Sequence, residues 1–219
     1  MLRTTYIRQL DTLREDLLRL GSMVEYALIH ALHAFETLDI VAAQEIRRND
    51  AAIDANRKLV ETQVIRLISA QIFNEQDPRL LASAFAIAGE LERIGDYAVS
   101  VARRTERIAR QPAIAAPPEA MRELAQLAKK MLNTSIESFL RQDLELAYGL
   151  RADEELADEL EDQISSELIQ MARDQPERLE SILGMLDVVH ALERIADRST
   201  NIAGRVIYLT VNINEELNP

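Results

Sequence analysis

The feature that most constrains the fold is an internal repeat. Residues 90–104 read ELERIGDYAVSVARR and residues 191–205 read ALERIADRSTNIAGR. Each copy carries the run LERI, an aspartate three places after its arginine and an Ala-x-Arg ending. The segments 34–54 and 138–158 also align, with Phe, Asp, Ala and Arg at matching positions. Because each copy covers about half of the chain, the sequence predicts that one structural unit occurs twice.

Within each half the apolar residues recur every three or four positions, which is the period of an amphipathic helix. The first half holds three such stripes, over residues 10–35, 53–67 and 80–101. Only 4% of the residues are aromatic and Ala and Leu dominate, which favours helices over strands. We therefore expect an all-α protein of two tandem antiparallel three-helix bundles related by internal duplication.

Breaks in the pattern predict where the helices end. The segment 111–120, QPAIAAPPEA, contains three prolines that an α-helix cannot accommodate in its interior, so we place the domain boundary there. The domains are then residues 1–112 and 113–219. Asp39 is expected to cap a helix that begins near residue 40, and Asp77-Pro78 and Gln175-Pro176 are expected to mark further helix starts.

Charge and composition exclude several classes of protein. The net charge of −12 disfavours nucleic acid as a partner and favours cations or basic protein surfaces. The apolar runs are too short for a transmembrane span, so no membrane insertion is expected. The first residues lack the apolar block of a signal peptide, and the chain has no cysteine. These observations exclude disulfides and thiolate metal sites and favour the cytoplasm.

Two acidic pairs occur at matching positions in each half. Residues four apart lie on one face of a helix, where two carboxylates repel each other and a cation between them reverses the sign of that interaction. Carboxylate oxygens are hard ligands that suit Mg, Ca, Mn or ferric iron. The pairs are predicted to flank the apolar stripes, where they stay accessible and can meet on neighbouring helices: Asp50 and Asp54, Glu92 and Asp96, Glu154 and Asp158, Glu193 and Asp197.

Other groups of residues give weaker evidence for a functional site. A carboxylate-bridged di-iron enzyme needs two Glu-x-x-His motifs, whereas only Asp187–His190 comes close, so the histidines are interpreted as structural. Arg93 and Arg194 follow the site glutamates directly and are expected to point away from the acidic stripe. They are interpreted as ordinary ion pairs, with contact to a partner or to phosphate as the alternative.

The repeated segments resemble the signatures of the PhoU family of bacterial phosphate-signalling proteins. LERIGD followed by Ser100, and LERIAD followed by Asn201, are similar to its two E-R-I-x-D segments. Asp50–Asp54 and Glu154–Asp158 are similar to the acidic segments on the preceding helices. The resemblance extends over essentially the whole chain, including its length, its duplicated three-helix units and its loops.

The resemblance implies a cytoplasmic, non-enzymatic and often homodimeric regulator. Such a protein negatively regulates the phosphate-starvation response by bridging the ATPase of the phosphate ABC transporter and a sensor histidine kinase. Some members accompany simple phosphate permeases instead. Some hold multinuclear iron or zinc clusters at the paired acidic motifs, and others bind no metal. Carried over by position, the ligand candidates are Asp50, Asp54, Glu92, Asp96, Glu154, Asp158, Glu193 and Asp197.

The two copies depart from each other at several positions. Ser100 and Tyr97 stand in the first signature where Asn201 and Arg198 stand in the second, so the first site is expected to be weaker or differently completed. Glu154 replaces an aspartate in the second half. Two alternatives stay open beside the regulator: a carboxylate-rich metal-dependent helical enzyme and a metal-free structural scaffold.

Overall fold

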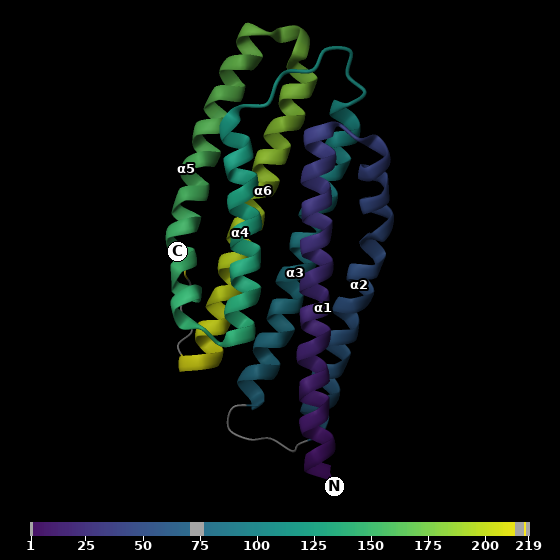
Figure 1. Cartoon of the computed structure of the whole chain (residues 1–219), viewed down its shortest axis with the longest axis vertical. Helices are drawn as coiled ribbons and strands as arrows, with labels where there is room; N and C mark the ends of the chain where they lie inside the picture. Colours follow the sequence, from purple (N-terminus) through teal and green to yellow (C-terminus); the bar gives the residue numbers. More distant parts are fainter. Residues whose placement is uncertain (1, 71–76, 213–216, 218–219) are drawn as a thin grey trace.

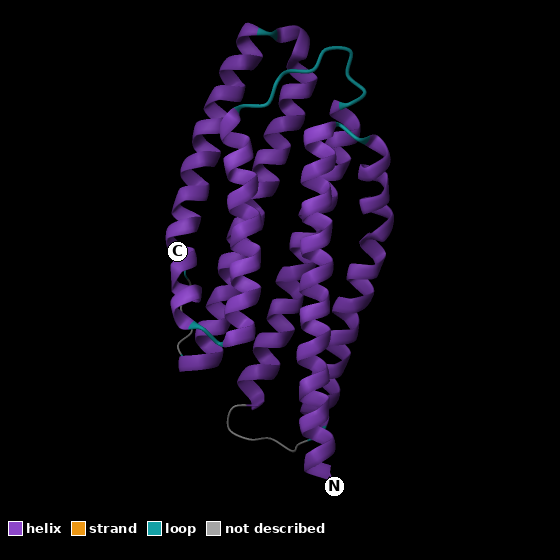
Figure 2. Cartoon of the chain, in the orientation of Figure 1, coloured by secondary structure: helices purple, strands orange, loops and turns teal. Residues whose placement is uncertain are grey.

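The protein is built from long α-helices, as the sequence predicts. The computed structural model describes residues 2–70, 77–212 and 217, and in these ranges the regular elements are all helices (Figure 2). A short 3₁₀ turn, η1 (Pro176–Arg178), precedes the last helix. The six α-helices are α1 (Leu2–Thr37), α2 (Ile40–Ser69), α3 (Asp77–Ile108), α4 (Glu119–Arg141), α5 (Leu144–Asp174) and α6 (Leu179–Val211).

The helices form two three-helix units that lie side by side (Figure 1). Helices α1 to α3 make the first unit and α4 to α6 the second, with neighbours in each unit running antiparallel. The proline-containing segment at residues 109–118 connects them and is not helical. Since α1 runs away from the N-terminal end while α4 runs back towards it, the two units point in opposite directions. The predicted pair of tandem bundles is confirmed.

The duplication is preserved in the conformation of one turn. Leu38 follows α1 with φ 54° and Gln142 follows α4 with φ 51°, both in the left-handed region. The next residue in each copy, Asp39 or Asp143, caps the following helix by accepting hydrogen bonds from two backbone N–H groups. The predicted cap at Asp39 is thereby confirmed. A left-handed residue followed by an aspartate cap reverses the chain within two residues.

The proline signals mark helix starts to within three residues, slightly more than the usual margin for helix boundaries. Helix α3 begins at Asp77 itself, one residue before the predicted first helical position at Pro78. Pro176 opens the 3₁₀ turn η1 rather than α6, and α6 begins at Leu179.

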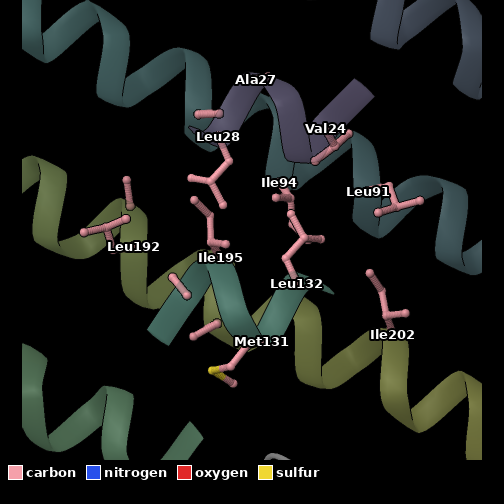
Figure 3. Close-up of a cluster of buried hydrophobic side chains, with 14 of the residues drawn as sticks. Val24, Ala27, Leu28, Leu91, Ile94, Met131, Leu132, Leu192, Ile195 and Ile202 are labelled. Atoms are coloured by element: carbon pink, nitrogen blue, oxygen red, sulfur yellow. The ribbon is translucent and has the colours of Figure 1, made fainter. Parts of the chain in front are cut away.

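One continuous apolar core joins the two units. Helices α3 and α6 pack against each other at the centre, and α1 also meets α4. Figure 3 shows side chains of the first unit facing side chains of the second, and each of these four is fully buried: Leu28, Ile94, Leu132 and Ile195. Burial of one such side chain contributes about 1.5–3 kcal/mol. Because buried residues of both halves form a single cluster, the domain boundary at 112/113 stays a prediction.

Polar links also cross the contact between α3 and α6. The Nε of Arg104 lies 2.9 Å from a carboxylate oxygen of Asp187, and Arg198 lies 3.3 Å from Glu90. The Ser83 hydroxyl donates to the backbone carbonyl of Arg205. No helix in the described part of the chain combines the length and apolarity needed to cross a membrane.

The packing of α3 on α6 leads to a stability prediction at Gly184. A Cβ built there would lie 2.6 Å from Cγ1 of Ile108, whereas a Cβ at Gly149 of α5 meets nothing within 4 Å. Gly184→Ala should therefore destabilise the protein by about 1–3 kcal/mol through overpacking. Gly149→Ala should stabilise it by up to about 1 kcal/mol through helix propensity.

Chemical denaturation of both variants measures the difference. Both substitutions place alanine in a helix, so propensity alone predicts the same sign for the two. Equal stabilisation of the two variants would show that α3 and α6 are not in such close contact.

Candidate functional site: two acidic clusters

The first-half carboxylates gather between α2 and α3. Asp50 and Asp54 lie one turn apart on α2, and Glu92 and Asp96 lie one turn apart on α3. Asp96 is exposed and the other three side chains are half-buried. We call these four residues the first cluster. The prediction that pairs on neighbouring helices face each other is met here, since the carboxylates lie close enough to influence one another's ionisation.

Burial and repulsion between carboxylates raise the pKa values of three residues of the first cluster. Burial raises the pKa of Asp50, and the charges of Asp96 and Asp54 raise it further. The pKa of Asp96 is raised by partial burial and by the charge of Asp54. The pKa of Glu92 is raised by partial burial and by the charges of Asp96 and Asp54. A bound cation would relieve this repulsion, which is the electrostatic signature expected of an acidic metal site.

Little positive charge compensates the first cluster. Arg57 of α2 lies 3.6 Å from Glu92 but is held more closely by Glu61, at 2.8 Å. Arg103 lowers the pKa values of Asp50 and Asp96 from a greater distance. Among the ion pairs of the described residues, none within 4.0 Å includes Asp50, Asp54 or Asp96.

The second cluster lies between α5 and α6, on the opposite flank of the molecule (Figure 1). It consists of Glu154 and Asp158 of α5 with Glu193 and Asp197 of α6. Burial raises the pKa of Glu154 to about 7, with further contributions from Asp158, Asp197, Glu155 and Glu193. The pKa values of Asp158 and Glu193 are raised by burial and by neighbouring carboxylates.

The prediction that all eight carboxylates stay accessible is wrong for two of them. Glu154 is 5% exposed and Asp197 is 7% exposed. Arg198 lies 2.7 Å from Asp197, and Arg194 approaches the same carboxylate to 3.7 Å. A helical wheel fixes where a side chain leaves its own helix, but it does not show that two arginines of α6 cover Asp197.

The side chain of Arg194 also points in a different direction from the one predicted. Its Nε lies 3.2 Å from Glu193, so the guanidinium folds back over the acidic residues rather than pointing away from them. The matching Arg93 of α3 instead reaches Glu90 at 4.0 Å. The two copies therefore use the same arginine differently.

The two clusters differ in their counter-ions, and their expected ranking as metal sites stays a prediction. Sequence comparison suggests that the first cluster is the weaker, because Tyr97 stands where the second copy has Arg198. In the structure Arg198 neutralises Asp197 and also reaches Glu90 of α3 at 3.3 Å, so the second cluster already carries internal cations. Sequence comparison identifies the Tyr97–Arg198 difference, but the partner Glu90 depends on packing between the halves.

The donors suit a hard cation, but they are not assembled around one. Within the described residues, no three His, Cys, Asp or Glu side chains are gathered at metal-binding spacing. Binding would therefore require side-chain rotation in either cluster. The histidine of the near-motif is engaged elsewhere, because His190 lies 3.1 Å from Glu161 while Asp187 pairs with Arg104.

Comparison with known proteins identifies relatives over the full length of this fold. A family model described as the PhoU domain matches twice, over residues 17–105 and 121–206. A PhoU homolog of Clostridium acetobutylicum, named a phosphate-specific transport system accessory protein, is 30% identical over 100% of both chains. A homolog of the same name from Pseudomonas aeruginosa is 28% identical over 92% of this chain and 83% of its own.

Solved structures agree with these sequence relatives. The crystal structure of PhoU from Pseudomonas aeruginosa matches with a TM-score of 0.92 and 27% identity, covering 95% of this chain and 100% of that one. The phosphate transport system regulatory protein PhoU from Streptococcus pneumoniae matches with a TM-score of 0.89 and 25% identity. That match covers 96% of this chain and 99% of the other.

The raised pKa of Glu154 predicts how the stability of the metal-free protein depends on pH. Folding raises this pKa from 4.5 to about 7, so the native state retains a proton that the unfolded state releases. The free energy of unfolding should therefore fall as pH rises from 4.5 to 7. Glu154→Gln removes the charge and should stabilise the protein by about 1–3 kcal/mol at pH 8, and by much less at pH 5.

Urea denaturation at the two pH values checks this expectation. Glu159→Gln, at an exposed position on the same helix, is the matched control and should have little effect at either pH. A Glu154→Gln gain of the same size at pH 5 and pH 8 would contradict the ionisation argument.

Proposed function

The chain belongs to the PhoU family, and from this premise we propose that it is a cytoplasmic regulator of phosphate uptake that acts by binding rather than by catalysis. The observation that carries the proposal is the double family match, which spans both three-helix units. The names of its relatives support an accessory role in phosphate-specific transport. A regulator of this kind needs surfaces rather than a catalytic centre, and the long helices of this fold provide such surfaces.

The proposed mechanism is a bridge between two proteins. The chain would contact the ATPase of a phosphate ABC transporter and a sensor histidine kinase, and would reduce the starvation response when phosphate is plentiful. A homodimer is the proposed functional unit. The family resemblance is the support for both the partners and the dimer.

A reporter strain tests the proposed regulation. Deletion of the gene should leave a phosphate-starvation promoter active in phosphate-rich medium, because the negative signal is lost. Supplying the intact gene should restore repression, and the purified protein should bind the transport ATPase and the kinase. Unchanged repression in the deletion strain would refute the proposal, and metal-dependent turnover by the purified protein would favour the enzyme alternative.

We further propose that the first cluster binds a hard cation, with iron, zinc, Mg or Mn as candidates. Neighbouring carboxylates raise the pKa values of Asp50, Glu92 and Asp96, and little positive charge lies among them. Asp54 and Asp96 would be the central donors, with Asp50 and Glu92 beside them. The second cluster would bind a cation more weakly because Arg194 and Arg198 compete for Asp197.

Elemental analysis of protein purified without chelator tests cation binding. Asp54→Asn with Asp96→Asn should remove more than half of the bound metal, since the two central donors of the first cluster lose their charge. The unfolding temperature of the metal-free protein should not fall, because Asp96 is exposed and Asp54 is half-buried. Asp197 is unsuitable for this variant because it is buried under Arg198.

A matched control makes the same charge change at another acidic pair. Glu155→Gln with Glu159→Gln removes two exposed carboxylates four residues apart on α5 and should leave the metal content of the first cluster unchanged. Equal metal loss in the two double variants would show that any acidic pair suffices. A metal-free wild type that still binds its partners would favour the scaffold alternative.

A further inference from the structure

A groove of about 390 Å³ runs between α1 and α2 on the outer face of the first unit. Its lining is mainly apolar, from side chains that include Met23, Ile46 and Ile53, and small residues at Ala42 and Ala52 keep it open. Tyr26 stands at its edge, is 59% exposed and contacts the ring of His30 at a centroid separation of 4.0 Å. The groove belongs to neither acidic cluster.

In the second half, larger apolar side chains stand at the matching positions. Leu146 and Leu156 occupy the positions of Ala42 and Ala52 in the other copy, and Leu156 is 46% exposed. Lys130 and Asp153 stand where Tyr26 and Asn49 stand, and their side chains pair at 2.8 Å across α4 and α5. The duplicated fold therefore tolerates leucines at these two positions, whereas the first half has alanines that line a concave apolar surface.

Charge restricts what the groove can accept. In a chain of net charge −12, the groove is lined by only one carboxylate, Glu45, near the α1–α2 turn, and one arginine, Arg19, lies towards its other end. A helix lying along the groove with its N-terminus at Glu45 would have its dipole complemented there, and its C-terminus would meet Arg19, which also pairs with Asp16 at 2.9 Å. Residues 19 to 30 of α1 span about three helical turns, or roughly 17 Å.

We propose that this groove binds one amphipathic helix of a protein partner. The helix would place apolar side chains at i, i+4 and i+7 between α1 and α2, which is a common mode of peptide recognition. A second copy of this chain fits less well, because an isologous contact would set one concave face against another. The choice of a protein partner rests on the proposed function, whereas the choice of surface does not.

Site-specific photocrosslinking in the full-length protein, produced in its own cells, tests the groove. Tyr26→p-benzoylphenylalanine places the photoreactive group at the edge of the groove, and the same replacement of exposed Tyr148 on α5 is a control outside the groove. The expected result is a crosslink from position 26, and not from 148, that mass spectrometry maps to the apolar face of a helix in another protein.

Two groove variants make the test specific. Ala42→Leu with Ala52→Leu copies the second half and should reduce the crosslink from position 26 at least tenfold. Ala51→Leu with Ala55→Leu adds the same side chains at exposed positions outside the groove lining and should not reduce it.

Three outcomes would overturn the proposal: no crosslink from position 26, a crosslink to a second copy of this chain, or equal loss in both double variants. The phosphate reporter, measured in the same strains, separates this inference from the proposed function. Normal repression by the otherwise unchanged protein, with no crosslink from position 26, would refute the groove and leave the regulatory role standing. Unchanged repression on gene deletion would refute the regulatory role and leave the groove result standing.

Discussion

The packing of α3 against α6 is the contact on which the rest of the structure depends. Each of these helices is the third helix of its unit and also the main contact with the other unit, so both are apolar over much of their circumference. The close approach of Gly184 to Ile108 sets how near the two helices can lie. With this pair at the centre, α2 and α5 become the outer flanks, and each acidic cluster forms where a central helix meets an outer one.

Divergence between the two copies has produced different electrostatics on the same framework. In the first cluster the carboxylates are left with distant or shared cations, so burial and repulsion raise their pKa values. In the second, Arg198 satisfies Asp197 and continues to Glu90 in the other unit. The difference between Tyr97 and Arg198 therefore gives the second cluster an internal counter-ion that also links the two halves.

The outer faces have diverged in the same way. Alanines on α2 line a groove at positions where α5 has leucines, and an ion pair in the second half replaces Tyr26 and Asn49 of the first. Burial of the core-facing positions is meanwhile the same in both copies, from Val24 and Ala128 to Val64 and Leu168. A duplicated core with unlike surfaces suits an adaptor, because one stable framework can present different faces to different partners.

The helices, their number and the twofold repetition could all be predicted from the sequence, because helical periodicity and capping depend on residues within a few positions of each other. It also placed each acidic pair on one helix face, since four residues make about one turn. Three features become visible only in the tertiary structure. Glu154 and Asp197 are buried, Arg194 folds back onto Glu193, and Arg198 reaches Glu90. These features depend on contacts between helices distant in the chain and on the rotamers of long side chains, which no local spacing records.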